Sequence, residues 1–487
     1  MMIGRDCRWV MGAPRGGWTV GGVAAARAAA AGLAVLLGAV GGGCQNTPSA
    51  HGGWSERTGD ETIGRGAIAG IVGEPEMRVR LGNAVTAIQI GATTGDSVSV
   101  TVAGGRGVPA KLRGPVSVRL SEARWELTDA AGLSAFFERT GDLVLAPPEA
   151  APPGAAGVSG AGAGGAGAKL PPPAPALTLN GARYPGTLRL TARTDVSQRA
   201  FDIIESVQME EYLKGVVSAE LPSQWPVGAF RAQAVAARSY AVHERARSRA
   251  AGKPFDVEST VADQAYKGAS ELPQAVQAVR ETRGVILTWM GGPLRAYYSS
   301  TSGGRSASAR DTWPIGPGYE YNLAGPLQAT AREHADEASP LHRWTVVRSR
   351  AELTQRLRQW GRTNGHALRN ITALDSIKVS SVNEVGRPTR YLVLQPGGQS
   401  YTMTAEALRQ ACNTEVQGLP AVTRASRVSS GDLEATVAGD AVTIKGRGFG
   451  HGVGMCQYSA KAMADRGDAW QKILANFYPG AELKKAY

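Results

Sequence analysis

The feature that most limits how this chain can fold is a pair of helical patterns separated by two prolines, within residues 207–249. In the first pattern, apolar side chains recur three and four residues apart, which places Met209 and Tyr212 on one helical face. That helix is expected to end before Pro222, because the residue before a proline is pushed out of the helical region. Pro226 suits the first turn of the second, alanine-rich helix, where a missing N–H leaves no hydrogen bond unmade. Two helices joined by a tight turn are therefore expected at the centre of the fold.

Glu220 lies at the corner between these helices, flanked by Ala219 and Leu221 and close in sequence to Trp225. A carboxyl held among apolar groups at the end of a helix, where backbone carbonyls point outward, should have a raised pKa. It would stay protonated at higher pH than a free carboxyl, which is what a general acid requires. A glutamate near a helix end is also often an ordinary solvated side chain, and spacing alone leaves both interpretations open.

Composition is that of an ordinary soluble protein with an excess of positive charge. The 487 residues are enough for more than one domain, and 43% of them are hydrophobic and 19% charged. The net charge of +12 favours an anionic neighbourhood such as nucleic acid, anionic lipid or an acidic wall polymer. Nucleic acid is not expected as a partner, because lysine and arginine are spread along the chain without runs interleaved with aromatic residues.

Residues 1–43 have the pattern of a targeting sequence. Arginines, including Arg5 and Arg8, precede an apolar run rich in alanine and glycine that ends directly before Cys44. The apolar part is short for a stable membrane span, and a retained N-terminal anchor helix is the alternative to secretion. Small residues before a cysteine are similar to a bacterial lipoprotein processing site, with Gly41 where leucine or valine is usual. We expect an exported envelope protein, either released or anchored to the membrane through a lipid on Cys44.

The four cysteines, Cys7, Cys44, Cys412 and Cys456, are too few and too scattered for a disulfide framework or a CxxC-type zinc site. After removal of the targeting segment, Cys412 and Cys456 would remain. The sequence alone leaves open whether they form a disulfide. No cofactor and no metal are expected.

The strand and linker pattern divides the chain into sections. Residues 45–76 are polar and have the composition of a flexible tether, and residues 77–147 contain short alternating runs that predict a small β-rich region. Residues 148–176 are almost uncharged Gly, Ala and Pro, so they form either a linker or a loop inserted within one β-rich unit. Residues 177–487 are predicted to form the catalytic domain. The predicted fold class is α+β, a helical core packed with antiparallel sheet.

Two further segments carry polar residues among small ones. Residues 285–300 predict a hairpin with its turn at Gly291, Gly292 and Pro293, which continues into the hydroxyl-rich loop STSGGRS. Near the C-terminus, KGRGFGHGVGMCQ combines a high density of glycine with His451. Glycine at this density permits either close backbone approach to a ligand or positive φ at several points. No GK[ST] follows, so a phosphate loop is excluded, and His451 is either a ligand-binding or a structural residue.

Together these segments resemble the SpoIID/LytB family of peptidoglycan-active proteins. The similarity is carried by three strings in the order and approximate separation of that family: MEEYLKGVVSAELPSQWPVGAFRAQAVAARSYA, YYSSTSGGRS, and GRGFGHGVGMCQYSAKAMADRG with ILANFYPG. It covers residues 180–485 well, and the strands before residue 147 look like the family's less defined N-terminal β portion. The resemblance implies a lytic transglycosylase that acts on peptidoglycan glycan strands and prefers strands stripped of their peptides.

The resemblance also implies roles for individual residues. The family's catalytic glutamate falls on Glu220. The residues expected to contact substrate are Gln233, Arg238, Tyr298, Ser300, Ser302, His451 and Gln457. Arg238 would position the substrate's lactyl carboxylate or stabilise charge near the site. Arg231, Arg238 and Arg245 also form a seven-residue stripe, which is typical of a solvated helix face.

The sequence departs from the family pattern at Leu221, where methionine is common, and at Ser459, where glycine is frequent. Some members resemble zinc proteins with a His/Cys cluster after the catalytic helix. This chain has no cysteine between Cys44 and Cys412, so we expect no metal at that place.

The chemistry of glycan cleavage limits how many carboxylates are needed. Hydrolysis usually takes two, whereas an intramolecular route takes one, because the muramyl C6 hydroxyl is already tethered close to C1. We expect Glu220 to be that single acid and base, with Asp263 and Asp311 as candidates for a second carboxylate. The alternative to an enzyme is a glycan-binding protein that stimulates a cell-wall amidase, as the resemblance to the family's amidase enhancers implies.

Overall fold

The structure, a computed structural model, describes residues 71–93, 97–105, 108–148 and 175–487. The expected targeting segment, Cys7, Cys44 and most of the expected tether lie outside the described residues. Within the described ranges, no helix is both long enough and apolar enough to cross a bilayer. The predicted α+β fold class is confirmed, because a run of strands precedes the central helices and most of the strand pairs in the described residues are antiparallel.

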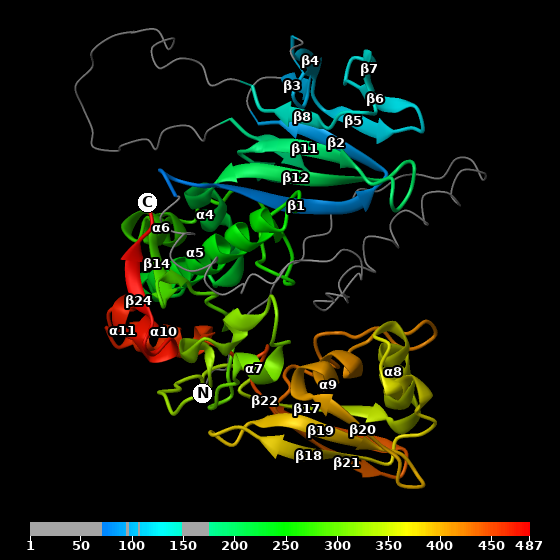
Figure 1. Ribbon diagram of the computed structural model, residues 1–487, viewed down its shortest axis with the longest axis vertical. Coiled ribbons are helices and arrows are strands. Elements are labelled where there is room, and N and C mark those ends of the chain that lie inside the picture. Colours follow the sequence, from blue (N-terminus) through cyan, green and yellow to red (C-terminus); the bar gives the residue numbers. More distant parts are fainter. Residues whose placement is uncertain (1–70, 94–96, 106–107, 149–174) are drawn as a thin grey trace, which may run out of the picture. The chain divides into compact units, whose positions relative to one another are not determined.

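Two sheets form the N-terminal part of the described chain (Figure 1). The first has the strand order β13-β1-β12-β11-β8-β3-β4 and the second has the order β10-β9-β2-β5-β6-β7. Their strands are β1 (Glu76–Val85), β2 (Ala87–Ala92), β3 (Ser97–Val102), β4 (Ala110–Arg113), β5 (Val116–Leu120), β6 (Arg124–Thr128), β7 (Ser134–Glu138), β8 (Leu143–Ala146), β9 (Leu177–Leu179), β10 (Ala182–Tyr184), β11 (Thr187–Ala192), β12 (Phe201–Gln208) and β13 (Val257–Glu258). Buried residues alternate with more exposed ones along strands such as β3 and β5, so these strands each bury one face.

Strands from both sides of residues 149–174 belong to the same two sheets. β11 pairs with β8, and β9 pairs with β2. In Figure 1 the blue strand β1 accordingly lies beside the green strand β12. The expected division between a β-rich region ending at residue 147 and a domain beginning at residue 177 is therefore not a division between sheets. This pairing favours a loop inserted within one β-rich unit over a linker between two units.

The two central helices form where the sequence predicts them. α4 (Met209–Glu220) ends before Pro222, and α5 (Val227–Ala250) begins after Pro226. Pro226 is the N-cap residue of α5, with an extended ψ of 145°, and so lies just outside the first turn in which it was expected. α6 (Pro273–Glu281) packs against both helices. α4, whose last residue is Glu220, therefore packs against both of the other helices.

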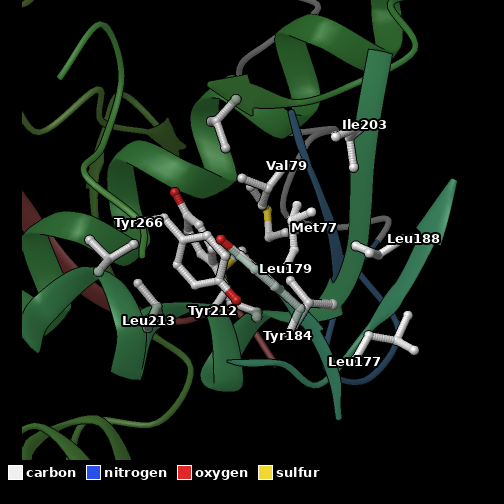
Figure 2. Packing of buried hydrophobic residues seen from close by; sticks show 14 of the residues in the cluster. Met77, Val79, Leu177, Leu179, Tyr184, Leu188, Ile203, Tyr212, Leu213 and Tyr266 are labelled. Carbon is white, nitrogen blue, oxygen red and sulfur yellow. The ribbon is translucent and has the colours of Figure 1, made fainter. Parts of the chain in front are cut away.

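The largest hydrophobic core joins the helices to the first sheet (Figure 2). Met77 and Val79 of β1 and Tyr212 of α4 contribute to it and are fully buried. The ring of Tyr266 lies 5.0 Å from that of Tyr212 and 6.1 Å from that of Tyr184, measured between centroids. Burying a large apolar side chain stabilises a fold by roughly 1.5–3 kcal/mol. This core therefore fixes α4 against the sheet.

The hairpin predicted over residues 285–300 is shorter than expected. The strands concerned are β14 (Val285–Trp289), β15 (Gly292–Pro293), β16 (Tyr298–Ser299), β23 (Met455–Cys456) and β24 (Glu482–Lys485). β14 turns at Met290 and Gly291, both with positive φ, and pairs with the two-residue β15. β16 does not return along β14 but pairs in parallel with β23, while β24 lies beside β14. The hydroxyl-rich loop is thereby brought against the glycine-rich segment.

A second hydrophobic core surrounds the other face of α5. It includes Val235 and Tyr240 of α5, Met463 of α10 and Phe477 of α11. The short helices of this part are α7 (Ala309–Thr312), η2 (Glu320–Leu323), η3 (Gly325–Leu327), α10 (Gln457–Asp465) and α11 (Trp470–Phe477). α10 begins at Gln457, directly after β23, so the paired strands β16 and β23 set where this helix starts.

Residues 343–447 have a hydrophobic core of their own, which the sequence did not separate from the rest of residues 177–487. It is built from β17 (Arg343–Ser349), α8 (Arg350–Thr363), η4 (Ala367–Asn370), β18 (Ser376–Val382), β19 (Pro388–Leu394), β20 (Ser400–Thr404), α9 (Ala405–Cys412), β21 (Leu433–Ala438) and β22 (Ala441–Arg447). Cys412 is buried in this core and Cys456 in the second one, and both are free thiols. The two cysteines therefore do not form the pair that the sequence left open.

Candidate functional site

Glu220 is the last residue of α4, and the chain leaves the helix at Leu221 in an extended conformation. Leu221 and Trp225 are 4% and 6% exposed, so the corner between α4 and α5 is largely apolar. Glu220 itself is half-buried. Burial raises the pKa of the Glu220 carboxyl, and hydrogen bonds from Gln457 and Ala265 and the charge of Lys267 offset this only in part. Glu220 thus lies at the corner where the sequence predicted it, and its pKa is raised, as predicted.

Each oxygen of the Glu220 carboxyl accepts one hydrogen bond. The amide of Gln457, at the start of α10, donates from Nε2 to Oε2 over 3.1 Å. The backbone N–H of Ala265 donates to Oε1 over 3.4 Å. Segments that are far apart in the sequence therefore meet at this carboxyl and hold its orientation.

Gln457 also links Glu220 to Gln233 on α5. Its Nε2 donates to Oε1 of Gln233 over 3.3 Å, and Gln233 is fully buried. The Nε2 of Gln233 has no hydrogen-bond partner among the described residues. Of the residues predicted to contact substrate, Gln457 therefore contacts Glu220 directly, and Gln233 is linked to it through Gln457.

Tyr298 belongs to the same polar network through Gln264. The Nε2 of Gln264 donates to the Tyr298 hydroxyl over 3.1 Å, and its Oε1 accepts from the Tyr212 hydroxyl over 3.0 Å. Burial raises the pKa of Tyr298 well above its ordinary value, and the nearby negative charge of Glu220 adds to this effect. Tyr298 is therefore neutral, with its hydroxyl held near Glu220.

Ser300 lies at the edge of this group. Its carbonyl accepts a hydrogen bond from the backbone N–H of Tyr458 over 3.1 Å, and its side chain is half-buried. The Tyr458 ring meets Trp225 edge to face with centroids 5.0 Å apart. Two aromatic rings and a serine thus flank the segments that hold Glu220.

Arg238 does not lie at this site. It is fully buried and forms a two-pronged ion pair with Glu210, with Nη2–Oε2 and Nε–Oε1 distances of 2.7 and 3.0 Å. Glu210 and Glu220 lie at opposite ends of α4, about 15 Å apart along the axis by the helix rise. Arg238 therefore has a structural role in place of the predicted contact with substrate. The alternative interpretation, that it lies on a solvated helix face, is also wrong, because the side chain is fully buried.

The Ser302 hydroxyl has partners other than Glu220. Its hydroxyl lies 2.8 Å from Nδ1 of His334 and 3.0 Å from Oδ2 of Asp336, and Ser302 is only 2% exposed. Asp336 also accepts hydrogen bonds from the Gly303 N–H and the Cys456 thiol. Because the hydroxyl is already bonded within the protein and buried, this position favours an anchoring role for Ser302 over contact with substrate.

Asp336 is also part of the one group of metal-type ligands found within the described residues. Ligand atoms of Asp336, Glu337 and His342 lie within 4.8 Å of one another. Asp336 already accepts from His342 Nδ1 over 3.1 Å and from the donors on the hydroxyl-rich loop. Its carboxyl is therefore satisfied by the protein itself, and this group does not coincide with the His/Cys cluster that some family members were expected to carry.

His451 contacts aromatic residues instead of the Glu220 carboxyl. Its ring meets Trp313 at 4.9 Å and Tyr297 at 5.9 Å, and its Nδ1 accepts from the Val453 N–H over 3.0 Å. Burial lowers the pKa of His451 to about 4, so the imidazole is neutral near pH 7. It lines a small cavity with Asp311, Arg387 and other residues. Both the predicted ligand role and the structural role of His451 fit this position.

The glycine-rich segment closes against another stretch of backbone. A Cβ at Gly454, where φ is +69°, would lie 2.0 Å from the carbonyl oxygen of Tyr297. At Gly448, where φ is +79°, it would lie 2.5 Å from the carbonyl oxygen of Thr301. The glycines therefore permit the close approach that sets β23 beside β16 and places Gln457 at the site.

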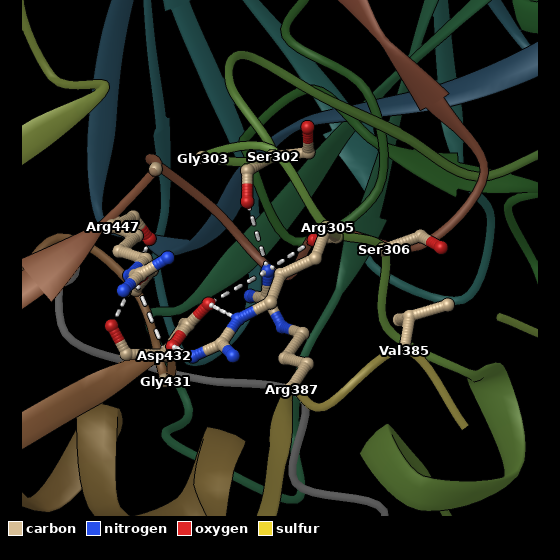
Figure 3. Close-up of polar contacts among 12 residues, drawn as sticks. Ser302, Gly303, Arg305, Ser306, Val385, Arg387, Gly431, Asp432 and Arg447 are labelled. Atoms are coloured by element: carbon tan, nitrogen blue, oxygen red, sulfur yellow. Dashed lines mark hydrogen bonds and ion pairs between the residues drawn. The ribbon is translucent and has the colours of Figure 1, made fainter. Parts of the chain in front are cut away.

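A buried ion-pair network joins the hydroxyl-rich loop to the unit formed by residues 343–447 (Figure 3). Arg305 donates to Asp432 through Nε and Nη2, at 2.7 and 2.6 Å. Arg387, which is 3% exposed, donates to the carbonyls of Ser302 and Arg305 over 3.0 and 2.9 Å. This unit thus supports the loop that carries Ser300, although it provides no contact to Glu220 among those described.

Neither candidate for a second carboxylate contacts Glu220 in the described part of the chain. Asp263 accepts from the Tyr240 hydroxyl and from the Glu258 N–H, each at 2.8 Å. Asp311 lies on α7 beside the small cavity that contains His451. Among the residues that the structure describes, neither hydrogen-bonds to Glu220 and neither is among the groups that shift its pKa.

Sequence reasoning missed the segment 264–268 and Tyr458. Gln264, Ala265 and Lys267 act on Glu220 or Tyr298 from an irregular stretch that has no periodic pattern. The contribution of Ala265 is a backbone N–H, which no residue type signals. Tyr458 stands inside a string that was quoted for the resemblance, and its position directly after Gln457 was the available clue.

Comparison with known proteins identifies two matching regions. Residues 197–289 match the family model SpoIID, described as stage II sporulation protein, and residues 320–454 match a domain of unknown function, DUF8618. The first match contains Glu220, Gln233 and the segment 264–268. The second contains the unit with its own hydrophobic core.

Several curated relatives are similar along much of the chain. An uncharacterised protein of Brachyspira hyodysenteriae is 29% identical over 307 residues, which cover 63% of this chain and 73% of that protein. The stage II sporulation protein D of Bacillus subtilis is 29% identical over 307 residues, covering 60% of this chain and 78% of that protein. The amidase enhancer of Bacillus subtilis is 28% identical over 299 residues, covering 56% of this chain and 40% of that protein.

Proposed function

The chain belongs to the SpoIID/LytB family, and we propose on this premise that it is a peptidoglycan lytic transglycosylase. Its substrate would be glycan strands, with a preference for strands stripped of peptides, and its product a 1,6-anhydro-muramyl end. The observation that carries the proposal is Glu220, a carboxyl with a pKa raised by burial and with both oxygens held by the protein. No cofactor is required by this chemistry.

One carboxyl is sufficient for the reaction. Protonated Glu220 gives its proton to the glycosidic oxygen as the bond from that oxygen to C1 of the muramyl residue breaks. The resulting carboxylate then takes the proton of the C6 hydroxyl while that oxygen bonds to C1. Glu220 ends the cycle protonated, and no water is consumed. The tethered C6 hydroxyl supplies the nucleophile at high effective concentration.

The surroundings of Glu220 support this route over hydrolysis. Hydrolysis would need a second carboxylate within about 10 Å to activate water or attack C1. Asp263 already accepts from the Tyr240 hydroxyl and the Glu258 N–H, and Asp311 lies beside the cavity that contains His451. The Gln457 amide, which donates to Oε2, favours the carboxylate form that must accept the C6 proton. Tyr298, Ser300 and Tyr458 stand nearby as candidates for hydrogen bonds and stacking with the sugar rings.

The test is digestion of purified, peptide-free glycan strands with wild type and with Glu220→Gln, followed by mass analysis of the ends. Wild type should produce anhydro-muramyl ends, and Glu220→Gln should lose activity by at least roughly 100-fold, since it has no proton to give. Glu211→Gln on the same helix is the matched control and should keep full activity, because Glu211 is partly exposed and forms its ion pair with Lys214. Free reducing ends from wild type would overturn the single-carboxylate route and indicate hydrolysis.

The alternative is a non-catalytic role, as a glycan-binding protein that enhances a cell-wall amidase. It is favoured by the similarity to a protein named amidase enhancer, of which this chain covers 40%. Binding of glycan strands without cleavage by wild type, together with faster release of peptides by an added N-acetylmuramoyl-L-alanine amidase, would establish it. In that case Glu220→Gln should leave the stimulation unchanged.

We further propose that the protein is exported and works in the cell envelope. The support is the sequence pattern of residues 1–43, with Cys44 as the candidate lipidation site, since both lie outside the described residues. Growth with a radioactive fatty acid would label wild type but not Cys44→Ser if the anchor is present.

A further inference from the structure

The proposed substrate carries an anion that the residues assigned so far do not bind. A muramyl residue without its peptide has a free lactyl carboxylate, whereas the peptide-bearing residue has a neutral amide there. Arg238 was expected to hold this carboxylate, but it is fully buried and paired with Glu210. A different cation must therefore serve if the carboxylate is recognised beside Glu220.

The segment 264–268 contacts the Glu220 carboxyl and contains a lysine, Lys267, whose charge acts on it. The Ala265 N–H donates directly to Glu220, and Lys267 follows two residues later. Between them Tyr266 is 3% exposed and packs against Tyr212 of α4. The backbone around Lys267 is thus tied both to Glu220 and to the helix that carries it.

Two glycines fix this segment more closely. A Cβ at Gly215 of α4 would lie 2.3 Å from the carbonyl oxygen of Gly268, so the helix and the segment are in direct backbone contact. Gly268 itself has a φ of +89°, and a Cβ there would lie 2.3 Å from the carbonyl oxygen of Arg183. Lys267 is held between Tyr266 and Gly268, and only its side chain extends outward.

The Lys267 side chain is available to a ligand. It is exposed, and it forms no ion pair among the described residues. Its positive charge reaches Glu220, where it lowers the pKa against the larger effect of burial. By comparison, Lys214 on α4 is already paired with Glu211.

We propose that Lys267 binds the free lactyl carboxylate of the muramyl residue that lies beside Glu220, and so makes the enzyme select strands without peptides. This inference rests on the proposed function. An ammonium on a flexible stem can follow a carboxylate that varies in position, and it gains nothing from a neutral peptide amide. Because the ion pair would be partly exposed, the expected selectivity is modest, about five- to tenfold.

Recognition of the carboxylate would also assist the proton transfer. Once Lys267 is neutralised by the bound carboxylate, it no longer lowers the pKa of Glu220 as strongly. Glu220 is then more fully protonated in the complex than in the free protein, which is the form required for the first step.

The experiment compares two substrates made from one preparation of peptide-free strands. In one the lactyl carboxyls are free, and in the other they are converted to neutral methylamides with carbodiimide and methylamine. The release of anhydro-muramyl ends is measured for wild type, Lys267→Gln, Lys267→Arg and the control Lys445→Gln. Lys445 lies on β22, is exposed and has no ion pair among the described residues, so its substitution removes the same charge elsewhere.

We expect Lys267→Gln to raise KM about five- to tenfold on the free-carboxyl strands with little change in kcat, and to leave KM on the amidated strands unchanged. Lys267→Arg should stay within about twofold of wild type, as should Lys445→Gln on both substrates. If wild type cleaves but Lys267→Gln keeps the wild-type preference, the inference is wrong and the proposed function stands. If wild type produces no anhydro ends from the free-carboxyl strands, the proposed function itself fails. Thermal unfolding of Lys267→Gln at the wild-type temperature excludes a loss of fold as the cause.

Discussion

The two ends of helix α4 carry glutamates with opposite electrostatic surroundings. Burial by itself would raise the pKa of Glu210, but Arg238, the Tyr487 hydroxyl and the Gly284 N–H together lower it below its ordinary value. Burial raises the pKa of Glu220. Two hydrogen-bond donors and the charge of an exposed lysine act in the opposite direction but do not reverse this shift. The same residue type on one helix is thus a structural anion at the first turn and a candidate acid at the last.

The comparison teaches that the partner of a carboxylate decides its role more than burial does. A guanidinium with two parallel hydrogen bonds keeps Glu210 ionised and unreactive. A primary amide such as that of Gln457 orients Glu220 without supplying charge, so the carboxyl keeps a proton that it can transfer.

Removing the cation that pairs with Glu210 at the N-terminal end of α4 should destabilise the protein. Arg238→Met leaves Glu210 without its ion-pair partner inside the protein, and we expect the free energy of unfolding to fall by about 3–5 kcal/mol. Urea unfolding followed by fluorescence measures it. The control is Arg231→Met on the same helix, whose pair with Glu281 is about one-third exposed and should contribute less than about 1 kcal/mol. Equal losses in the two variants would contradict the structural role of Arg238.

A third carboxyl, Glu205 of β12, tests whether burial without a cation is enough to raise a pKa. It is fully buried and accepts from the Gly186 N–H over 3.1 Å. Burial raises its pKa from 4.5 to about 7. Because the folded state then holds the proton more tightly than the unfolded chain, this carboxyl contributes stability at low pH that is lost as pH rises through about 7.

Glu205→Gln should therefore flatten the pH dependence of stability. Between pH 5 and pH 8 the wild type should lose roughly 3 kcal/mol that the variant does not lose, as an order of magnitude. Urea unfolding at both pH values gives the two differences. If wild type and variant change by the same amount, burial alone does not raise the pKa of a carboxyl in this protein.

The smallest effect is expected from the residue that orients Glu220. Gln457 donates to Glu220 and lowers its pKa, so Gln457→Leu should raise that pKa and keep the acid protonated to higher pH. The alkaline limb of the profile of kcat against pH should move upward by about one pH unit. Gln277→Leu on α6 removes an amide that donates to Glu281 and not to Glu220, and it should leave the profile unchanged. A downward shift for Gln457→Leu would contradict the role assigned to Gln457.

Local patterns were enough to predict several elements of this protein. The spacing of apolar residues predicted α4, the prolines predicted the corner after it, and the apolar neighbours of Glu220 predicted the direction of its pKa shift. These features depend on residues close in sequence, where side-chain spacing and backbone sterics act directly. The α+β class followed from the same local signals.

The tertiary structure alone decided which distant residues meet. Arg238 and Ser302 share strings with residues that do reach the site, yet the first pairs with Glu210 and the second with Asp336. Lys267 and the Ala265 N–H act on Glu220 from a segment without any periodic pattern. A sequence records residue types and local spacing, but the energy of a buried charge depends on the partner that packing brings to it, which here is often a residue far along the chain.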